Sequence, residues 1–137
     1  TTMRVETLKR YGVEATLLQS HPDPAAREAR IREMATPWAR GFDAHSLVVL
    51  LQGTERYNVE PDMGRIKAKV LYVISRTDTL FPPSLAPGVM ARLKKAGVDA
   101  TYFEIDSDKG HLASGADADK WAPALGQFMA GLNGPRS

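Results

Sequence analysis

The stretch VLYVISRTDTLFPP, from Val70 to Pro83, contains the strongest structural signal in the sequence. Its first part, Val70 to Ile74, is a continuous run of apolar residues, which is typical of a strand covered on both faces in a parallel sheet. The run stops at Arg76-Thr77-Asp78, and Pro82-Pro83 stiffens the exit that follows. The pattern predicts a buried strand that ends on a carboxylate.

A helix, a second strand and a closing helix are predicted after this strand. Ser84 to Ala96 places its apolar residues on one helical face, and Gly97 stands where a helix ends. Ala100 to Ile105 reads as a strand, and Asp117 to Leu132 as an amphipathic helix. Single helices between short strands indicate an α/β class with a right-handed parallel crossover.

The preceding part of the chain is predicted to be helical. A helix is expected from about Pro24, with Pro37 ending or kinking it, and Asp43 is placed to cap a second helix from Ala44 to Tyr57. A polar hinge, Asn58 to Gly64, follows. The predicted organisation is therefore a helical segment, residues 1–60, and a βαβα segment, residues 61–137.

Composition and charge exclude several classes of function. The chain has 137 residues, a net charge of +2 and no cysteine, so disulfides and thiolate chemistry are excluded. Its densest basic cluster, Arg27 to Arg32, is interleaved with Glu28 and Glu33, which argues against a nucleic-acid surface. No apolar run is long enough for a membrane span and no signal region is visible, so a cytoplasmic location is expected.

The loops after the two strands carry a carboxylate and an imidazole. The first reads RTDTLFPP and presents Asp78, and the second reads DSDKGHLAS and presents His111. Parallel strands bring such loops to one edge of the sheet, where ligand chemistry gathers in open α/β folds. An Asp that accepts from a His ring N–H fixes its tautomer, so Asp78 and His111 would form the back half of an acyl-transfer triad.

The segment from Lys67 to Ser114 resembles the C-terminal part of the homoserine O-acetyltransferase family of α/β-hydrolases. In that family a strand leads to a catalytic Asp and a Leu-Phe-Pro-Pro-like turn, and the next strand leads to a Gly-His that carries the catalytic His. Gly41 to Leu47, GFDAHSL, is similar to the Arg-Phe-Asp-Ala-Asn-Ser-Tyr segment of the family's helical lid. The resemblance covers roughly Pro24 to Leu132, which is most of the chain.

This resemblance implies the C-terminal portion of an α/β-hydrolase fold preceded by a helical lid, with residues 1–60 as the lid. Asp78 and His111 match the triad acid and base. The implied reaction is ping-pong acyl transfer to a hydroxyl acceptor or to water, with acetyl-CoA as an acyl-donor substrate and no bound cofactor. The family also implies a homo-oligomer through the lid helices.

The serine nucleophile of that triad has no counterpart in the sequence. The nucleophile elbow has the pattern Gly-x-Ser-x-Gly, and none of the serines has glycines at this spacing. The serines are Ser20, Ser46, Ser75, Ser84, Ser107, Ser114 and Ser137. Because the chain begins at Thr1 with its first Met at position 3, we expect a processed, cleaved or truncated chain whose partner is the N-terminal half of the same enzyme.

Departures from the family pattern bear on the substrate. Leu112 follows the candidate catalytic His where the family has Asp, while Gly41 and His45 replace Arg and Asn in the lid motif. An apolar residue beside the His cannot pair with the ammonium group of an amino acid. The departure favours an esterase, or a transferase for a less polar alcohol.

Simpler interpretations remain open for each of these features. Asp78 taken alone would be a turn cap, and a lone His111 would be a surface histidine. The chain would then be a non-catalytic module that dimerises through the helices between Pro24 and Tyr57. A receiver-like or nucleotide-binding domain is a weaker alternative, because no phosphate-binding glycine-rich turn is present.

Other polar and aromatic residues are assigned structural roles. His21 and His45, with Asp23 and Asp43 nearby, do not form a recognisable metal site, so no metal is predicted. Trp38 and Trp121 are interpreted as packing residues. Asp106 and Asp108, which flank Ser107, are interpreted as turn formers with solvated charges.

Overall fold

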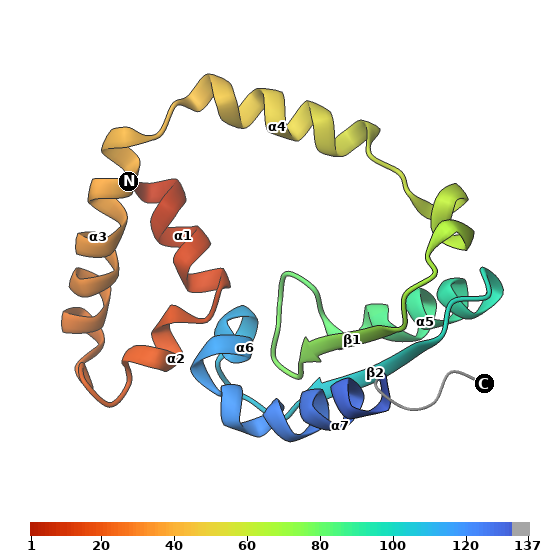
Figure 1. Cartoon of the computed structure of the whole chain (residues 1–137). Coiled ribbons are helices and arrows are strands. Elements are labelled where there is room, and N and C mark those ends of the chain that lie inside the picture. The colour runs from red at the N-terminus through yellow and green to blue at the C-terminus, as the bar shows by residue number, and fades with distance from the viewer. Residues whose placement is uncertain (133–137) are drawn as a thin grey trace.

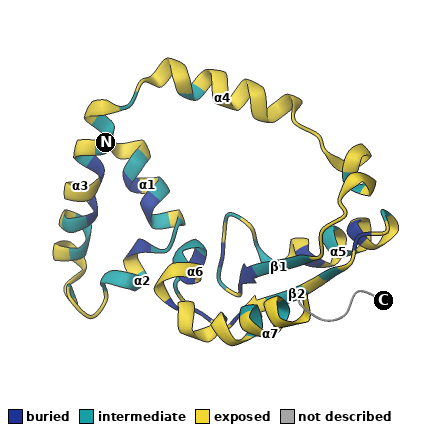
Figure 2. Cartoon of the chain, in the orientation of Figure 1, coloured by how far each residue is buried: buried dark blue, intermediate teal, exposed yellow. Residues whose placement is uncertain are grey.

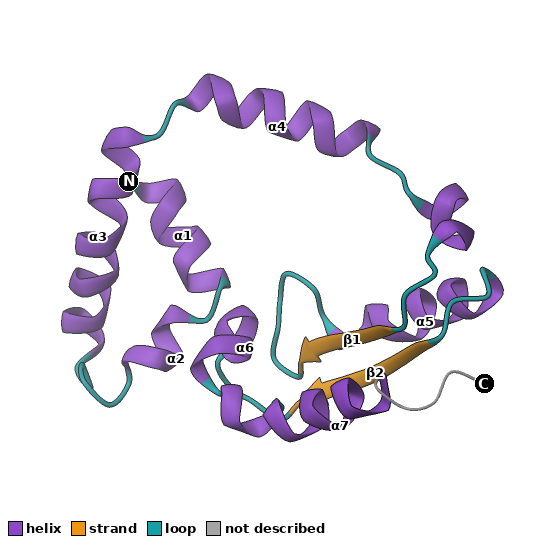
Figure 3. Ribbon diagram, in the orientation of Figure 1, coloured by secondary structure: helices purple, strands orange, loops and turns teal. Residues whose placement is uncertain are grey.

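The computed structural model, which describes residues 1–132, contains one pair of parallel strands within that range. Strands β1 (Val70–Ser75) and β2 (Ala100–Ile105) pair in register, from Val70 with Ala100 to Ser75 with Ile105. Helix α5 (Ala86–Lys95) makes the crossover between them (Figure 3). The predicted order of strand, helix and strand is confirmed, and both strands end at the same edge of the sheet.

The end of α5 shows why the crossover stops where the sequence predicted. Gly97 has a φ of +77°, and its N–H donates to the carbonyl of Lys94 at 3.0 Å. The next N–H, on Val98, donates to the carbonyl of Leu93 at 3.0 Å, so the two bonds form a Schellman motif. The side chains of Leu93 and Val98 are both buried, which fixes the turn into β2.

The strands are less covered than predicted. Ile74 and Ser75 of β1 are buried, but the four residues from Val70 to Val73 are only partly buried. The expectation of a strand covered on both faces is therefore wrong for most of β1 within residues 1–132. Among the described residues, β1 also has a single neighbouring strand, so one of its edges is unpaired.

The first 41 residues form a separate helical core. Helices α1 (Thr2–Arg10) and α2 (Val13–Leu17) lie beside α3 (Pro24–Gly41) (Figure 1). Spacings of three and four residues place the apolar side chains on facing sides of the helices. The buried members of this core are Val5, Leu8, Val13, Ile31 and Ala35.

Helix α3 starts as predicted but does not end at Pro37. Asp23 caps it by accepting a hydrogen bond from the N–H of Ala26 at 2.7 Å. The helix continues past Pro37 to Gly41, so the prediction of an end there is wrong. The proline removes one N–H from an exposed face, where water can satisfy the freed carbonyl. Packing also holds the last turn, because Trp38 stacks on Phe42 with ring centroids 4.2 Å apart.

Helix α4 (Ala44–Arg56) confirms the predicted cap and ends one residue before the predicted end at Tyr57. Asp43 accepts from the N–H groups of His45 and Ser46. Figure 2 shows that α4 is exposed along its length and has no buried residue. Its apolar residues Val48 to Leu51 are 49–64% exposed. Among residues 1–132, no helix has the length and hydropathy needed to cross a membrane.

The segment after β2 is broken into shorter helices than predicted. A 3₁₀ turn, Gly110–Leu112, leads into the short helix α6 (Ala113–Ala116), and α7 begins only at Ala122 and runs to Leu132. The predicted start at Asp117 is wrong because the Asp117 side chain bonds to Ser107 and Lys109 instead of capping a helix. Trp121 precedes α7, and its ring N–H donates to the carbonyl of Ser114 at 2.9 Å.

The turn between α1 and α2 rests directly on the loop after β2. The N–H of Leu112 donates to the carbonyl of Tyr11 at 3.1 Å. Gly12 has a φ of +93°, and a Cβ atom added to it would lie 2.4 Å from the carbonyl oxygen of Lys109. Glycine is therefore required here for both its backbone conformation and its lack of a side chain.

Replacing Gly12 by alanine is expected to lower the free energy of unfolding by about 2 kcal/mol or more. The left-handed conformation alone costs about 1–2 kcal/mol for a residue with a Cβ atom, and the overlap with Lys109 adds to this. Urea unfolding of the complete protein measures the change. The matched control is Gly53→Ala inside α4, where a new Cβ meets nothing within 4 Å and should stabilise the helix by about 0.5–1 kcal/mol. Equal unfolding midpoints for the two variants would contradict the prediction.

Candidate active site

Asp78 lies directly after β1 and uses its two carboxylate oxygens for different purposes. Oδ1 accepts hydrogen bonds from the N–H groups of Leu80 at 2.8 Å and Phe81 at 3.1 Å. Oδ2 lies 2.8 Å from Nδ1 of His111. The turn-capping role and the histidine-orienting role, which the sequence left as alternatives, are therefore both present in one side chain.

His111 lies in the 3₁₀ turn after β2, beside the end of β1. Its ring is flanked by Tyr11 and Phe81, with centroid separations of 5.3 and 5.6 Å. The side chain is 37% exposed, whereas that of Asp78 is only 7% exposed. Nε2, the other ring nitrogen, makes no hydrogen bond to any residue between 1 and 132. The predicted proximity of Asp78 and His111 is thus observed, with one imidazole nitrogen left available.

Electrostatics favour the ionised form of Asp78. Burial raises the pKa of Asp78, but hydrogen bonds from His111, Phe81 and Leu80 lower it, and its pKa lies below the ordinary value. Because the carboxylate can only accept, Nδ1 of His111 carries the hydrogen and Nε2 is left as the basic nitrogen of the neutral ring. The stability that this carboxylate contributes is present above its unfolded pKa of about 3.9 and is lost as the pH falls through the folded value.

A buried polar cluster holds the loop that carries His111, which we call the His loop, residues 106–112. Ser107 is 1% exposed, and its hydroxyl donates to Asp117 at 2.6 Å and accepts from the N–H of Lys109 at 3.0 Å. The ammonium group of Lys109, followed by the Ser107 hydroxyl, holds the pKa of Asp117 well below its usual range. Lys120 pairs with the same carboxylate at 3.1 Å. This cluster holds the loop through the side chains of Ser107 and Lys109.

No local sequence pattern predicts this cluster. In the sequence, Ser107 stands between charged loop residues, which does not indicate a buried side chain. Its hydroxyl is buried against Asp117, which lies ten residues later in the chain. The flanking acids behave as predicted: Asp106 forms an exposed ion pair with Arg76 at 2.8 Å, and Asp108 is exposed.

A mostly apolar cavity of about 360 Å³ opens beside Asp78 and His111. Its other walls include Tyr72, Ile74, Ser75, Phe81, Ile105 and Trp121. The buried hydroxyl of Ser75 has no hydrogen-bond partner among residues 1–132. Ser75 and Ser114 are the serines that line the cavity, and neither hydrogen-bonds to His111. The described residues therefore provide an acid and a base but no serine held by that base.

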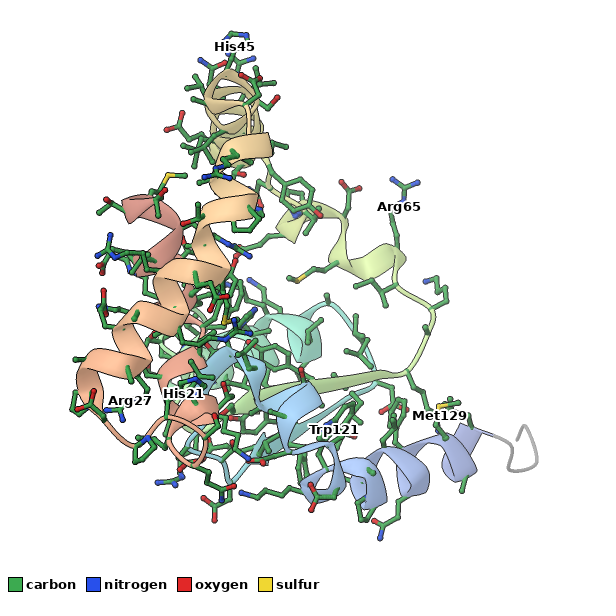
Figure 4. All side chains as sticks on the ribbon, turned by 90° about the vertical axis from the view of Figure 1, so that its left-hand side faces the viewer. His21, Arg27, His45, Arg65, Trp121 and Met129 are labelled. Atoms are coloured by element: carbon green, nitrogen blue, oxygen red, sulfur yellow. The ribbon has the colours of Figure 1, made fainter. Side chains whose placement is uncertain are left out.

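The remaining candidate residues do not join the site. Figure 4 shows His45 at the top of the view, at the start of α4, and His21 far below it beside the turn before α3, with no contact between them. Leu112, which replaces the family's Asp, packs against the helical core formed by α1, α2 and α3 and does not line the cavity. Trp121 does line it, so this residue is both a packing residue and a wall of the site.

Comparison with known proteins finds related enzymes that are much longer. The sequence is 34% identical over 97 residues to a homoserine O-acetyltransferase of Haemophilus influenzae, covering 66% of this chain and 27% of that protein. It is 32% identical over 105 residues to a serine O-succinyltransferase of Litchfieldella anticariensis, covering 70% and 29%. The chain thus spans less than a third of the length of these curated relatives. No family model matches the chain.

The fold has a solved counterpart. The crystal structure of esterase E22 superposes with a TM-score of 0.59 and 28% sequence identity, covering 75% of this chain and 30% of the esterase. The similar proteins are therefore acyltransferases and an esterase.

Proposed function

Because the chain is related to the homoserine O-acetyltransferases of the α/β-hydrolase superfamily, we propose that it supplies the acid and base of a serine-dependent acyl-transfer enzyme. The observation that carries the proposal is the 2.8 Å contact between Nδ1 of His111 and Oδ2 of Asp78. The contact leaves Nε2 free to exchange a proton with a reacting hydroxyl.

The proposed chemistry has two matched steps. Nε2 of His111 takes the proton of a serine hydroxyl as its oxygen attacks the acyl carbonyl, and the resulting imidazolium is stabilised by Asp78. The imidazolium then gives its proton to the leaving group, which departs and leaves an acyl-serine. In the second step Nε2 deprotonates the acceptor hydroxyl or water, which attacks the acyl-serine, and the proton returns to the serine oxygen.

The serine is proposed to lie on a segment outside residues 1–137, in the N-terminal half of the same enzyme. Ser75 supports this placement because a buried hydroxyl without a partner costs about 1–3 kcal/mol. One edge of β1 is also unpaired among the described residues, although its last residues are buried. A segment packed along this edge could satisfy both features and bring the nucleophile to His111.

The nature of the cavity supports hydrolysis, or transfer to a weakly polar alcohol, over transfer to an amino acid. Its walls are mainly aromatic and aliphatic, and no carboxylate other than Asp78 lines it. Since Asp78 is already occupied by His111 and two N–H groups, the described residues that line the cavity offer no free anion for a substrate ammonium group. Acetyl-CoA is retained as the proposed acyl donor in the transferase reaction.

The rival view of a non-catalytic dimerisation module has some support from α4. Its exposed apolar residues suit a contact between two copies, and such a contact is compatible with the enzymatic proposal. The close Asp78–His111 contact is not required by a pure assembly role, so we favour the enzyme.

Covalent labelling of the complete protein tests the proposal. A fluorophosphonate should modify one serine outside the 137 residues, as located by peptide mass spectrometry, and labelling should block hydrolysis of p-nitrophenyl acetate. His111→Ala should slow both reactions, because the serine loses its base. Labelling of Ser75 or Ser114, or ester turnover by a protein with no labelled serine, would refute the proposed placement. Partition of the acyl group between water, butanol and homoserine then identifies the acceptor class.

A further inference from the structure

Thr77 connects the loops that carry Asp78 and His111 through a single hydroxyl group. Its Oγ1 donates a hydrogen bond to the carbonyl of Ser107 at 2.9 Å. The same oxygen accepts one from the N–H of Gly110 at 3.0 Å. Thr77 immediately precedes Asp78, and Gly110 immediately precedes His111. The hydroxyl therefore joins the two loops one residue away from each member of the Asp78–His111 pair.

We propose that Thr77 is a positioning residue, which acts by holding the His loop at a fixed separation from Asp78. The inference rests on the proposed function, because it assigns Thr77 a role in the reaction of that site. Beyond β1 and β2, the backbone link between the loops is the bond from the N–H of Arg76 to the carbonyl of Ile105, at 3.0 Å. Thr77 continues this link past the end of the sheet, where loops otherwise gain freedom to move.

Ser107, the residue whose carbonyl accepts from Thr77, is held in place by other contacts. It is almost fully buried and is held by Asp117 through its own hydroxyl. Lys109 and Lys120 neutralise the Asp117 carboxylate. A displacement of the His loop relative to Thr77 would therefore break a buried polar cluster, not a single exposed bond.

Gly110 is fixed from the opposite side as well. It has a φ of +56°, and a Cβ atom added to it would meet the carbonyl oxygen of Tyr11 at 3.3 Å. The glycine backbone is thus enclosed between the α1–α2 turn and the Thr77 hydroxyl. A hydroxyl is needed at position 77 because the neighbours are one acceptor and one donor, and a side chain without a polar atom satisfies neither.

Two substitutions of Thr77 in the complete enzyme distinguish the effect of its hydroxyl group from the effect of its side-chain shape. Thr77→Val keeps the shape and removes both hydrogen bonds, so kcat for p-nitrophenyl acetate should fall about 10- to 100-fold, as expected for a displacement of about 1 Å. KM should stay within about threefold, because the substrate contacts remain. Thr77→Ser keeps the hydroxyl and should restore most of the lost kcat. The control is Thr101→Val, an exposed threonine on β2, which should leave both constants unchanged.

Two NMR measurements report the geometry independently of turnover. The downfield resonance of the His111 Nδ1–H should weaken or shift in Thr77→Val and persist in Thr77→Ser. The Gly110 amide of the wild-type protein should exchange slowly with solvent, which remains measurable even if Thr77→Val does not fold.

The outcomes distinguish this inference from the proposed function. A wild-type kcat in folded Thr77→Val, an unchanged Nδ1–H resonance, or Gly110 exchange at the rate of an unstructured peptide would overturn the role of Thr77. Absence of both serine labelling and ester turnover in the wild type would refute the proposed function instead, while the two NMR measurements would still show whether Thr77 holds the pair.

Discussion

Replacement of His111 by alanine is expected to lower kcat of the complete enzyme by about four to six orders of magnitude. The imidazole is the only group among residues 1–132 that is both basic and oriented by Asp78. Without it, the serine hydroxyl has no acceptor for its proton and the leaving group has no donor. KM should change little, since the cavity walls remain in place. Steady-state kinetics with an aryl ester measure both constants.

The matched control for this substitution is His45→Ala. His45 is exposed on α4, and its side chain makes no hydrogen bond to the described residues, so this variant should retain wild-type activity. Near-UV circular dichroism of both variants checks that the fold is retained. A kcat for His111→Ala within about tenfold of the wild type would exclude a triad role.

Replacement of Asp78 by asparagine is expected to lower kcat by about four orders of magnitude. The asparagine Oδ1 can still accept from Leu80 and Phe81, so the turn should survive. Its amide NH₂ then faces Nδ1 of His111 and donates to it. This forces the hydrogen of the neutral ring onto Nε2, which can no longer accept the proton of the serine.

Asp108→Asn provides the control, since it removes one negative charge from an exposed position in the His loop. Its kcat should match that of the wild type within about twofold, because solvent and salt screen the charge of an exposed carboxylate. In Asp78→Asn, a rise in activity toward high pH would show that hydroxide replaces the lost base. An Asp78→Asn enzyme with more than about a tenth of the wild-type kcat would contradict the assigned role of the carboxylate.

The parts of the fold that the sequence predicted correctly are those controlled by local patterns. The apolar run from Val70, the strand at Ala100 to Ile105 and the cap at Asp43 are each set by neighbouring residues. The proximity of Asp78 and His111 was also predicted correctly, because a parallel crossover brings the ends of both strands to one edge of the sheet.

Several features that the sequence did not predict have a different physical origin, which is contact between residues that are not neighbours in sequence. Asp117 was predicted inside a helix but is held by Ser107 and Lys109 in a neighbouring loop. Tyr11 and Gly12 contact the backbone of the His loop, although most of the chain lies between them in sequence. No periodic pattern of residues predicts such a contact. The bridging role of Thr77 was invisible for the same reason, since both of its partners lie on the loop after the other strand.

The close approach of Gly12 to Lys109 limits how this protein can be rebuilt by recombination. At Gly12 the helical segment meets the backbone of Lys109 directly, so a mismatch at this point cannot be absorbed by repacking a side chain. A chimaera that takes residues 1–60 from one homologue and the remainder from another should therefore tolerate differences on α4, yet fail when the two parents differ at position 12 or in the backbone of the His loop. Gly12 and Gly110 should therefore come from the same parent, because the backbone around one glycine lies against the backbone around the other.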